Sequence, residues 1–458
     1  MNYFSTRDKN LKFSFKDIFL RGLAPDGGLF LPSEIKKYTQ AEIKKLSQLS
    51  YIDLATEIIL NFCESDIEKS KLKSLIEKSY KVFNNKEVVL IKKIGDINLL
   101  ELYNGPTLAF KDIAMQVIGN MYEELDISKE KKVNIVVATS GDTGSAAISA
   151  LSDRKNINVF VLHPYKKISN IQRKIMTTVG STNIYNLAIK GNFDDCQKIV
   201  KDMFSDNQFR EKINMSGVNS INWARIICQI VYYFYTVFKF PNKEINFSVP
   251  TGNFGDVYAG YIAKKMGLPI NKLIVATNEN NIIQRVINSG EYKPTQVKPS
   301  LSPSMDIQVS SNFERLLYDV LNKNDKKVLS LMQNLTENGF FKLSKEEVDK
   351  IKEDFIAVKI SDNETLEIIK KYENQFNFIL DPHTATAVGA SKKINSNSNT
   401  VILGTAHPYK FLETIKKATG KEVKPPRQFL KLLDKKEKYD ILDNNTSKIK
   451  DYILKKII

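Results

Sequence analysis

The sequence predicts an α/β protein with mostly parallel sheets, and two observations carry this prediction. From Val88 onward, short runs of β-branched residues alternate with longer amphipathic segments, which is the pattern of parallel strands connected by helices. Glycine-rich turns follow two of these runs, as expected where a strand leads into a helix. The chain of 458 residues is 42% hydrophobic and 26% charged, which suggests two or three domains around a large core.

Six short runs are the expected strands, at residues 134–138, 159–162, 184–189, 246–249, 273–276 and 400–403. Before them, residues 1–95 combine a short N-terminal motif with helical patterns at 38–50 and 66–82. We therefore expect a mainly helical N-terminal domain. The lysine-rich tail beyond Gly420 is expected to be a surface helix.

The apolar run from Ile226 to Phe238 is the longest in the chain, and Gln229 interrupts it. A membrane span needs about 20 apolar residues, so this run is too short and is expected to form a buried helix.

The composition favours an ordinary enzyme in a reducing compartment. The net charge of +16 comes from lysines spread along the whole chain, so we expect solvated surface and neither nucleic acid nor a membrane as partner. Cys63, Cys196 and Cys228 are far apart and lack paired histidines, which argues against a disulfide framework and against a metal site. Charged residues from Arg7 to Lys12 leave no continuous apolar core for a signal peptide. The expected localisation is cytoplasmic.

The first candidate for chemistry is Lys111, which follows the apolar residues 108–110. Pro106 stiffens the approach, and a helix is expected at 112–125, directly after the lysine. Burial and the positive end of this helix both favour the neutral amine, which can form an imine with an aldehyde. The alternative is a surface lysine that begins a helix.

Two glycine-rich loops are the candidates for anion binding, each between an expected strand and an expected helix. The first, before a helix at 145–151, comprises Ser140, Gly141, Asp142, Thr143 and Gly144. The second, before a helix at 257–266, comprises Gly252, Asn253, Phe254, Gly255 and Asp256. Glycine allows close backbone approach, and a helix N-terminus favours negative charge. Neither loop has a nucleotide P-loop motif or a strict GxGxxG, so we expect two small anions rather than ATP or NAD.

A second phosphate site is expected around Arg225. Ser220 is expected to be the N-cap of a helix that runs to residue 238, with Asn222 and Arg225 on one face. Arg225 can bind a phosphate bidentately, and Asn219, Ser220 and free N–H groups would complete the shell. The structural alternative is a capped helix with Trp223 in the core and Arg225 in an ion pair.

Together these segments resemble the threonine synthase family, which are pyridoxal-phosphate enzymes of the tryptophan-synthase-β fold group, in the branch with a long N-terminal domain. Further matches lie at Tyr3 with residues 5–7, and at 22–29, 191–197, 276–280 and 405–408. The resemblance extends from about Tyr3 to Phe411, in order and with sensible spacing. The last forty or so residues lie outside it.

The resemblance implies two open, twisted, mostly parallel sheets flanked by helices, which is fold type II of the pyridoxal-phosphate enzymes. It places the N-terminal domain at residues 1–95, and the large cofactor-binding domain at 96–120 and 236–420. The small domain would comprise residues 121–235, and a helical C-terminal tail would follow at 421–458.

The resemblance also implies a role for each motif. Lys111 would form the imine with pyridoxal phosphate, Asp142 would lie near the ring hydroxyl, and Thr405 would hydrogen-bond the pyridine nitrogen. The cofactor phosphate would be held by Gly252, Asn253, Phe254, Gly255 and Asp256. The substrate carboxylate would be bound by Ser140, Gly141, Thr143 and Gly144, and the substrate phosphate by Asn219, Ser220 and Arg225.

The implied reaction converts O-phosphohomoserine and water to threonine and phosphate, the last step of threonine biosynthesis. Lys111 would be the base, and Arg225 would stabilise the departing phosphate. Two alternatives stay open: a related phospho-lyase that releases a 2-keto acid, and a catalytically silent metabolite-binding homologue. The expected protein is a monomer or homodimer.

Two positions depart from the family pattern. Asp8 stands where a glycine commonly follows Ser-Thr-Arg, and Asp256 replaces a common asparagine. A carboxylate beside a phosphate is repulsive, so we expect Asp256 to turn away and cap the helix that follows. The three histidines each lie beside a proline and are expected to be structural rather than acid–base groups: His163, His383 and His407.

Overall fold

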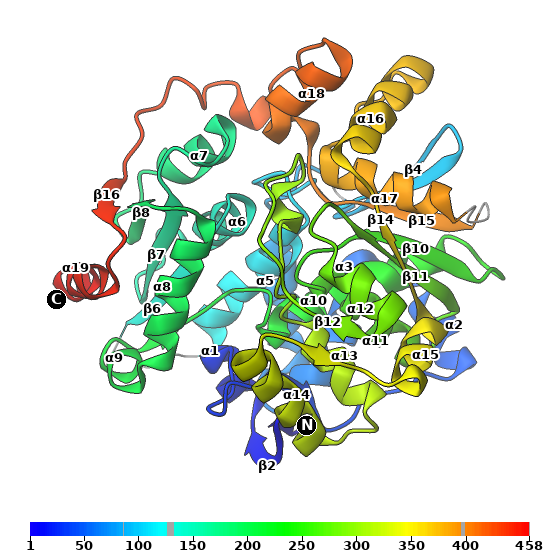
Figure 1. Ribbon diagram of the computed structural model, residues 1–458, viewed down its shortest axis with the longest axis horizontal. Coiled ribbons are helices and arrows are strands. Elements are labelled where there is room, and N and C mark those ends of the chain that lie inside the picture. The colour runs from blue at the N-terminus through cyan, green and yellow to red at the C-terminus, as the bar shows by residue number, and fades with distance from the viewer. Residues whose placement is uncertain (86, 126–131, 395–398, 458) are drawn as a thin grey trace.

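Two open sheets lie on either side of the central helices α5 (Lys111–Glu124) and α10 (Trp223–Phe238) (Figure 1). The computed structural model describes residues 1–85, 87–125, 132–394 and 399–457. Nearly all strand pairings within the two sheets are parallel, and all six expected strands are present. The fold class predicted from the sequence is confirmed.

The five-stranded sheet is fully parallel. Its order is β16 (Asp440–Asp443), β8 (Ile184–Lys190), β7 (Ile157–Pro164), β6 (Val133–Ala138) and β9 (Met215–Ser216). All eight residues of β7 are buried, because helices cover both faces of the sheet. The helices of this half are α6 (Asp142–Leu151), α7 (Asn170–Thr177), α8 (Phe193–Ser205) and α9 (Asn207–Lys212).

The six-stranded sheet is parallel except at one edge, where β4 pairs antiparallel with β5. Its order is β14 (Phe355–Lys359), β11 (Ile270–Thr277), β10 (Ile245–Pro250), β15 (Thr400–Gly404), β5 (Ile97–Glu101) and β4 (Leu90–Ile94). The helices of this half are α11 (Gly255–Lys265), α12 (Ile282–Ser289), α15 (Lys345–Asp354), α16 (Asp362–Phe376), α17 (Pro382–Lys393) and α18 (Leu412–Thr419).

The N-terminal region combines a small antiparallel sheet with four helices. The sheet consists of β1 (Tyr3–Ser5), β2 (Asp8–Phe13) and β3 (Phe30–Pro32), and the helices are α1 (Phe15–Arg21), α2 (Gln40–Leu46), α3 (Tyr51–Cys63) and α4 (Lys69–Tyr80). Ser14, Thr39 and Ser50 cap the first three helices by accepting backbone N–H bonds. The two helical patterns expected from the sequence correspond to α2 and α4, and the sequence analysis missed α3.

Between α12 and α15 the chain forms a compact excursion with short elements. These are β12 (Glu291–Tyr292), the 3-10 helix η1 (Pro303–Met305), α13 (Phe313–Val320), α14 (Asp325–Asn338) and β13 (Phe341–Lys342). Arg7 forms a bidentate ion pair with Glu314 of α13, with N–O distances of 2.9 and 2.8 Å. This pair joins the N-terminal sheet to the excursion.

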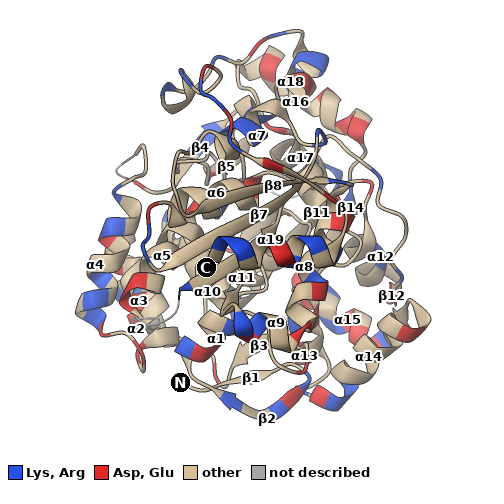
Figure 2. Ribbon diagram, turned by 90° about the vertical axis from the view of Figure 1, so that its left-hand side faces the viewer, with Lys and Arg blue, Asp and Glu red and all other residues tan. Residues whose placement is uncertain are grey.

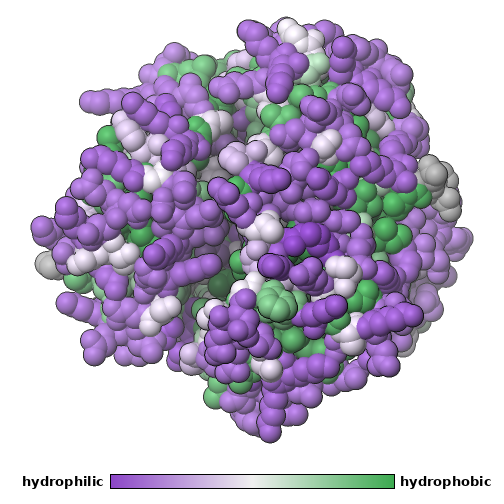
Figure 3. All heavy atoms as spheres, in the orientation of Figure 1, coloured by the Kyte–Doolittle hydropathy of each residue, from purple (hydrophilic) through white to green (hydrophobic). Residues whose placement is uncertain are grey.

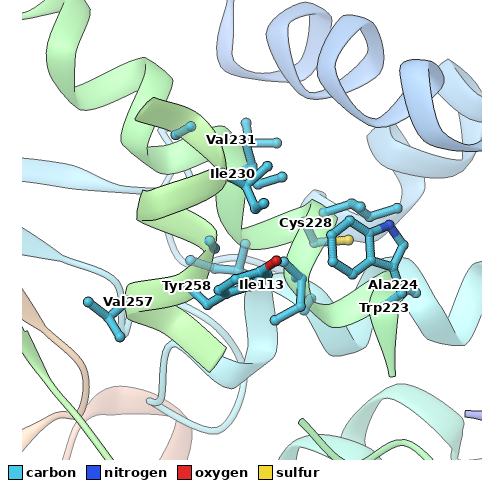
Figure 4. Close-up of a cluster of buried hydrophobic side chains, with 14 of the residues drawn as sticks. Ile113, Trp223, Ala224, Cys228, Ile230, Val231, Val257 and Tyr258 are labelled. Atoms are coloured by element: carbon cyan, nitrogen blue, oxygen red, sulfur yellow. The ribbon is translucent and has the colours of Figure 1, made fainter. Parts of the chain in front are cut away.

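The core between the two sheets is built around α10, in which every residue but the last is buried. Figure 4 shows Trp223 and Cys228 of this helix close to Tyr258 of α11 and Ile113 of α5. Burial on all sides explains the apolar run that the sequence analysis expected to be a buried helix. Among the described residues, neither α10 nor any other helix is long and apolar enough to cross a membrane.

The C-terminal segment was expected to be a surface helix, and this prediction was incomplete. After α18 the chain runs across the molecule to the five-stranded sheet (Figure 1), where β16 pairs parallel with β8. The terminal helix α19 (Thr446–Ile457) then packs on α8. Ile449 and Ile453 are fully buried against it, so the segment completes a domain rather than lying on the surface.

Acidic and basic residues are interspersed over the helices of the face drawn in Figure 2. Many of the lysines form exposed ion pairs, such as Lys73 with Asp53 at 2.8 Å and Lys190 with Asp443 at 3.0 Å. This distribution agrees with the expectation that most of the excess lysines are solvated surface.

Replacing Ile453 by alanine is expected to lower the free energy of unfolding by roughly 2–5 kcal/mol, because a fully buried side chain leaves a cavity between α19 and α8. Urea denaturation followed by circular dichroism measures the loss. Lys455→Ala, at an exposed position of the same helix, is the matched control. Equal unfolding midpoints for the two variants would show that α19 does not contribute to the core.

Candidate active site

A cavity of about 1030 Å³ lies between the two halves, where loops leave the carboxyl ends of β6, β10 and β15. Figure 3 shows the surface hollowed at the middle of this face. Ligands of open α/β sheets bind at this edge of the strands. All the predicted site residues line the cavity except Gly141 and Gly144: Lys111, Ser140, Asp142, Thr143, Asn219, Ser220, Arg225, Gly252, Asn253, Phe254, Gly255, Asp256 and Thr405.

The loop that carries Lys111 is fastened to the end of β15 by backbone hydrogen bonds. The Phe110 N–H donates to the Thr405 carbonyl at 2.9 Å, and the His407 N–H donates to the Leu108 carbonyl at 3.1 Å. Leu108 has a φ of 58°, an unusual conformation for a branched residue, which the loop's contacts impose. These bonds bring Lys111 and Thr405, 294 positions apart in the chain (405 − 111), to the same cavity.

A buried carboxylate holds the lysine loop from within. Asp112 accepts the Thr107 N–H at 2.8 Å and the Thr107 hydroxyl at 2.7 Å. Burial raises the pKa of Asp112 to about 6, although both bonds from Thr107 lower it. The turn between Thr107 and Asp112 therefore sets where α5 begins and where Lys111 points.

The Lys111 side chain is 12% exposed, and its amine lies 3.5 Å from Oδ2 of Asp142. Burial lowers the pKa of Lys111, and the positive charges of Lys410 and Arg225 lower it further, while Asp142 opposes them. The direction is the one expected from the sequence, and it favours the neutral, nucleophilic amine.

Asp142 is the centre of a cluster of buried charges. Its Oδ1 lies 2.5 Å from the Lys410 amine and accepts a bond from Gln172 Nε2 at 3.0 Å. Burial alone would raise the pKa of Asp142, but Lys410 and then Lys111 outweigh burial and hold it well below its ordinary value. Asp142 is therefore an anion at neutral pH.

Gly141 and Gly144 shape the first loop rather than facing the cavity. Both of their N–H groups donate to the Thr139 hydroxyl at 2.9 Å, so these donors are already occupied. Gly141 has a φ of 139°, and a Cβ on Gly144 would lie 2.5 Å from the Thr139 methyl group. That these two residues contact a substrate carboxylate stays a prediction, and within this loop Ser140, Asp142 and Thr143 line the cavity.

The second loop is held open for a ligand by contacts on its outer side. The Asn253 carbonyl accepts bonds from the N–H and the side-chain amide of Asn312, at 3.1 and 3.0 Å. Phe254 lies in the left-handed region with a φ of 64° and immediately precedes α11. A Cβ on Gly252 would lie 2.8 Å from the Ser304 carbonyl, so only glycine fits there. The first N–H groups of α11 have no partner within the helix, which makes this end an anion site.

The prediction that Asp256 caps α11 is wrong. Asp256 lies within the first turn of the helix and makes no capping bond. Its Oδ1 instead accepts the hydroxyls of Tyr232 and Tyr233 from α10, at 2.5 and 2.9 Å. Among the described residues, its Oδ2 is buried without a hydrogen-bond partner. Burial raises the pKa of Asp256 to about 6, against the two tyrosine bonds that lower it.

The prediction that Ser220 caps α10 is also wrong, because Asn222 is the N-cap. The Asn222 Oδ1 accepts the Ala224 N–H at 3.0 Å, and its Nδ2 donates to the carbonyls of Phe19 and Gly217 at 2.9 and 3.3 Å. A serine hydroxyl has a single donor, whereas the asparagine amide accepts through Oδ1 and has two N–H donors for the two carbonyls. Asn222 thus joins the N-terminal region to the start of α10.

Arg225 lies in the first turn of α10, is 2% exposed and lines the cavity. Its Nη1 donates to the Val218 carbonyl at 3.2 Å, and its Nε is buried with no hydrogen-bond partner within the described part of the chain. Burial lowers the pKa of Arg225 to about 10, so the group stays cationic at neutral pH. The ion pair that the sequence analysis kept as an alternative for Arg225 is not among the salt bridges of the described residues.

Sequence reasoning missed two groups that the fold brings to the site. Lys410, in the 3-10 helix η2 (Pro408–Phe411), is fully buried against Asp142. Its signal was a lone lysine between two aromatic residues, Tyr409 and Phe411. His383 lines the cavity, accepts the Ser304 N–H on Nε2 at 3.2 Å and contacts Asp381 through Nδ1 at 3.0 Å. These bonds fix its ring and agree with the structural role expected for it.

Comparisons with known proteins agree with this geometry. The model of the pyridoxal-phosphate dependent enzyme family matches residues 93–405, and models of the threonine synthase N terminus and C-terminal region match residues 2–80 and 384–453. The threonine synthase of Pseudomonas aeruginosa is 41% identical over 99% of this chain and 98% of its own. That of Saccharomyces cerevisiae is 44% identical over 91% of this chain and 88% of its own.

Solved structures show the same likeness. The crystal structure of the pyridoxal-phosphate-bound threonine synthase from Brucella melitensis has a TM-score of 0.95 and 40% identity, and the match covers 100% of this chain and 99% of that one. The chain is therefore a pyridoxal-phosphate-dependent enzyme of fold type II. Within that class, it belongs to the threonine synthase family. The family match to residue 453 also corrects the expectation that the last forty or so residues lie outside the resemblance.

The residues of the cavity fit this cofactor on physical grounds. Lys111 offers an amine with a lowered pKa, and the end of α11 offers N–H donors beside a glycine that no larger residue can replace. The buried and unpartnered Arg225 Nε and Asp256 Oδ2 both belong to residues that line the cavity. A buried polar atom without a partner costs free energy unless a ligand satisfies it.

Replacing Asp256 by asparagine is expected to change how the stability of the apoprotein depends on pH. The folded-state pKa of about 6 lies above the model value of 3.8, so the native state favours the protonated acid. The associated stability is present below pH 4 and is lost as the pH rises through 6. As the pH rises from 4 to 7, the free energy of unfolding of Asp256→Asn should therefore increase by roughly 3 kcal/mol relative to that of the wild type.

Urea unfolding at several pH values measures this difference, with the exposed Asp434→Asn as the control for loss of one carboxylate. A constant difference between Asp256→Asn and the wild type would mean that the tyrosine bonds already accommodate the charge.

Proposed function

We propose that the chain catalyses the threonine synthase reaction, in which O-phosphohomoserine and water give threonine and phosphate. The observation that carries this proposal is a single cavity that combines the Lys111 amine, the anion site at the start of α11 and the buried cation of Arg225. The relatives named above are threonine synthases, which supports the same assignment.

Pyridoxal phosphate, when bound, supplies an aldehyde for Lys111 and an electron sink that acidifies C–H bonds of the substrate. The N–H groups from Gly252 to Asp256 would hold the cofactor phosphate at the start of α11. The Thr405 hydroxyl would hydrogen-bond the pyridine nitrogen, and Asp142 would lie near the ring hydroxyl, since both residues line the cavity. These three contacts would fix the ring between the two halves of the molecule.

Lys111 moves protons during the reaction. Its neutral Nζ would be the base that takes the proton from the substrate Cα. Burial and the nearby cations lower the pKa of this amine, which favours its neutral form. Its place at the start of α5 is fixed by the hydrogen bonds between Asp112 and Thr107, so the amine would be positioned before the substrate binds.

Arg225 selects and activates the substrate phosphate. Its Nε has no hydrogen-bond partner among the residues that the structure describes, and Asn219 and Ser220 line the same cavity. A buried guanidinium stabilises the charge that develops as phosphate leaves, and it discriminates against serine and threonine, which lack the phosphate. The hydroxyls of Ser140 and Thr143 bind the substrate carboxylate beside the start of α6.

The wider organisation is proposed on the same basis. The protein acts in the cytoplasm, as a monomer or homodimer. Its three cysteines are all buried and free, which suits a reducing compartment. We place the large domain at residues 96–120 and 236–420, with the N-terminal region before it and the small domain at 121–235. The sheet order adds β4 to the large domain and β16 with α19 to the small one.

Incubation of the purified protein with O-phosphohomoserine is expected to release threonine and inorganic phosphate in equal amounts, as measured by amino-acid analysis and a phosphate assay. Lys111→Ala should lower the rate by roughly 10²–10⁴-fold or more, because the base is lost. Lys93→Ala, at an exposed position, is the control for loss of a lysine. A predominance of 2-oxobutyrate would identify a phospho-lyase instead, and no turnover would indicate a silent homologue.

Replacing Arg225 by methionine is expected to lower kcat/KM for O-phosphohomoserine by roughly 10²–10³-fold, because the group that stabilises the departing phosphate is absent. Inhibition by inorganic phosphate should weaken in parallel. Arg225→Lys keeps the charge without the bidentate geometry, so its kcat/KM should lie between those of the wild type and Arg225→Met. The exposed Lys198→Met is the matched control. An unchanged inhibition constant for phosphate in Arg225→Met would place the substrate phosphate elsewhere.

A further inference from the structure

Lys410 is the most deeply buried lysine of the site, with a relative exposure of 0%. It lies in η2, beyond the Thr405 position, and is not among the residues assigned to the cofactor or the substrate. Its amine contacts Asp142 Oδ1 at 2.5 Å and donates to the Thr107 carbonyl at 3.0 Å. A buried ammonium is costly unless it is paired, so these two contacts determine where Lys410 points.

The two oxygens of Asp142 are used differently. Oδ1 receives the close contact from Lys410 and the bond from Gln172. Oδ2 receives the longer contact from Lys111, at 3.5 Å, and a bond of the same length from the Ser304 hydroxyl. The carboxylate that is nearest to Lys111 is thus already paired with another lysine.

The groups that face Lys111 come from four other elements. Asp142 of α6 and Asp256 of α11 are acidic, whereas Lys410 of η2 and Arg225 of α10 are basic. Asp112, the next residue of α5, is bonded to Thr107. Without Lys410, the ionised Asp142 would have Lys111 as its one lysine partner within 4 Å among the described residues.

We propose that Lys410 is a positioning residue for imine formation: it pairs with Asp142 on the oxygen away from Lys111 and thereby leaves the Lys111 amine free to attack the cofactor aldehyde. The contact of Lys410 with the Thr107 carbonyl has a second effect, because Thr107 also holds Asp112 and so sets the start of α5. The inference rests on the pyridoxal-phosphate dependence of the family and not on the substrate proposed above.

The test measures the reactivity of Lys111 itself, in full-length apoprotein, without substrate. Competitive labelling with acetic anhydride across pH 6–10, read by mass spectrometry of the Lys111 peptide, gives the pKa of this amine. Lys410→Met should make Lys111 about tenfold less reactive near neutral pH, since a shift of one pKa unit changes the neutral fraction tenfold. Lys410→Arg keeps the charge and should retain most of the wild-type reactivity. The exposed Lys431→Met controls for the loss of one positive charge.

A second pair of variants covers the case in which Lys410→Met does not fold, because it would leave Asp142 poorly paired. Asp142→Asn and the double variant Asp142→Asn with Lys410→Met leave no unpaired carboxylate. Lys111 should be almost equally reactive in the double variant and in Asp142→Asn alone, because Lys410 acts through a carboxylate that both variants lack.

The absorbance change on adding pyridoxal phosphate gives an independent readout, and imine formation should slow in the same variants. An unchanged labelling profile in folded Lys410→Met, or an equal shift in Lys410→Arg and Lys410→Met, would overturn the proposal. So would a tenfold difference in Lys111 reactivity between Asp142→Asn and the double variant. Failure to make threonine would leave these measurements unaffected, so the two proposals fail separately.

Discussion

Asp142 lies between two lysines, Lys410 at 2.5 Å and Lys111 at 3.5 Å, and all three side chains are almost completely buried. Asp142 begins α6 beside the five-stranded sheet, whereas both lysines come from segments next to the six-stranded sheet. Separating these charges from one another in a dry interior would cost several kcal/mol per unpaired ion. The cluster therefore holds the two halves of the molecule in register at the cavity, and its charges act on the pKa of the Lys111 amine.

The remaining parts of the site are positioned by hydrogen bonds to backbone groups rather than by ion pairs. Hydrogen bonds from Phe110 and His407 fasten the lysine loop to the end of β15, so Lys111 and Thr405 share one cavity. Asn222 joins α10 to the N-terminal region and so fixes the direction of Arg225. Arg315 adds to this by donating to the carbonyls of Phe30 and Ile221. The N-terminal region thus supports the site as well as covering it.

Much of this could be predicted from local sequence. The strands, the lysine loop and the two glycine-rich turns have patterns that depend on neighbours in the chain, and the structure has each of them in its expected place. The errors share a different cause. Asp256 receives two tyrosine hydroxyls from α10, and Asn222 rather than Ser220 caps its helix. Each outcome depends on a side chain or hydrogen bond that residue order does not reveal.

The sequence by itself determined the fold class, the reactive lysine and the anion-binding loops, because periodicity, glycine placement and helix starts are local properties of the chain. The tertiary structure alone decided which charges face one another. Lys410 and Asp142 are 268 positions apart (410 − 142), and their contact exists only because the packed sheets bring η2 against α6. The pairing of buried charges depends on their distance in three dimensions and on the exclusion of water. Neither can be read from the order of residues in the sequence.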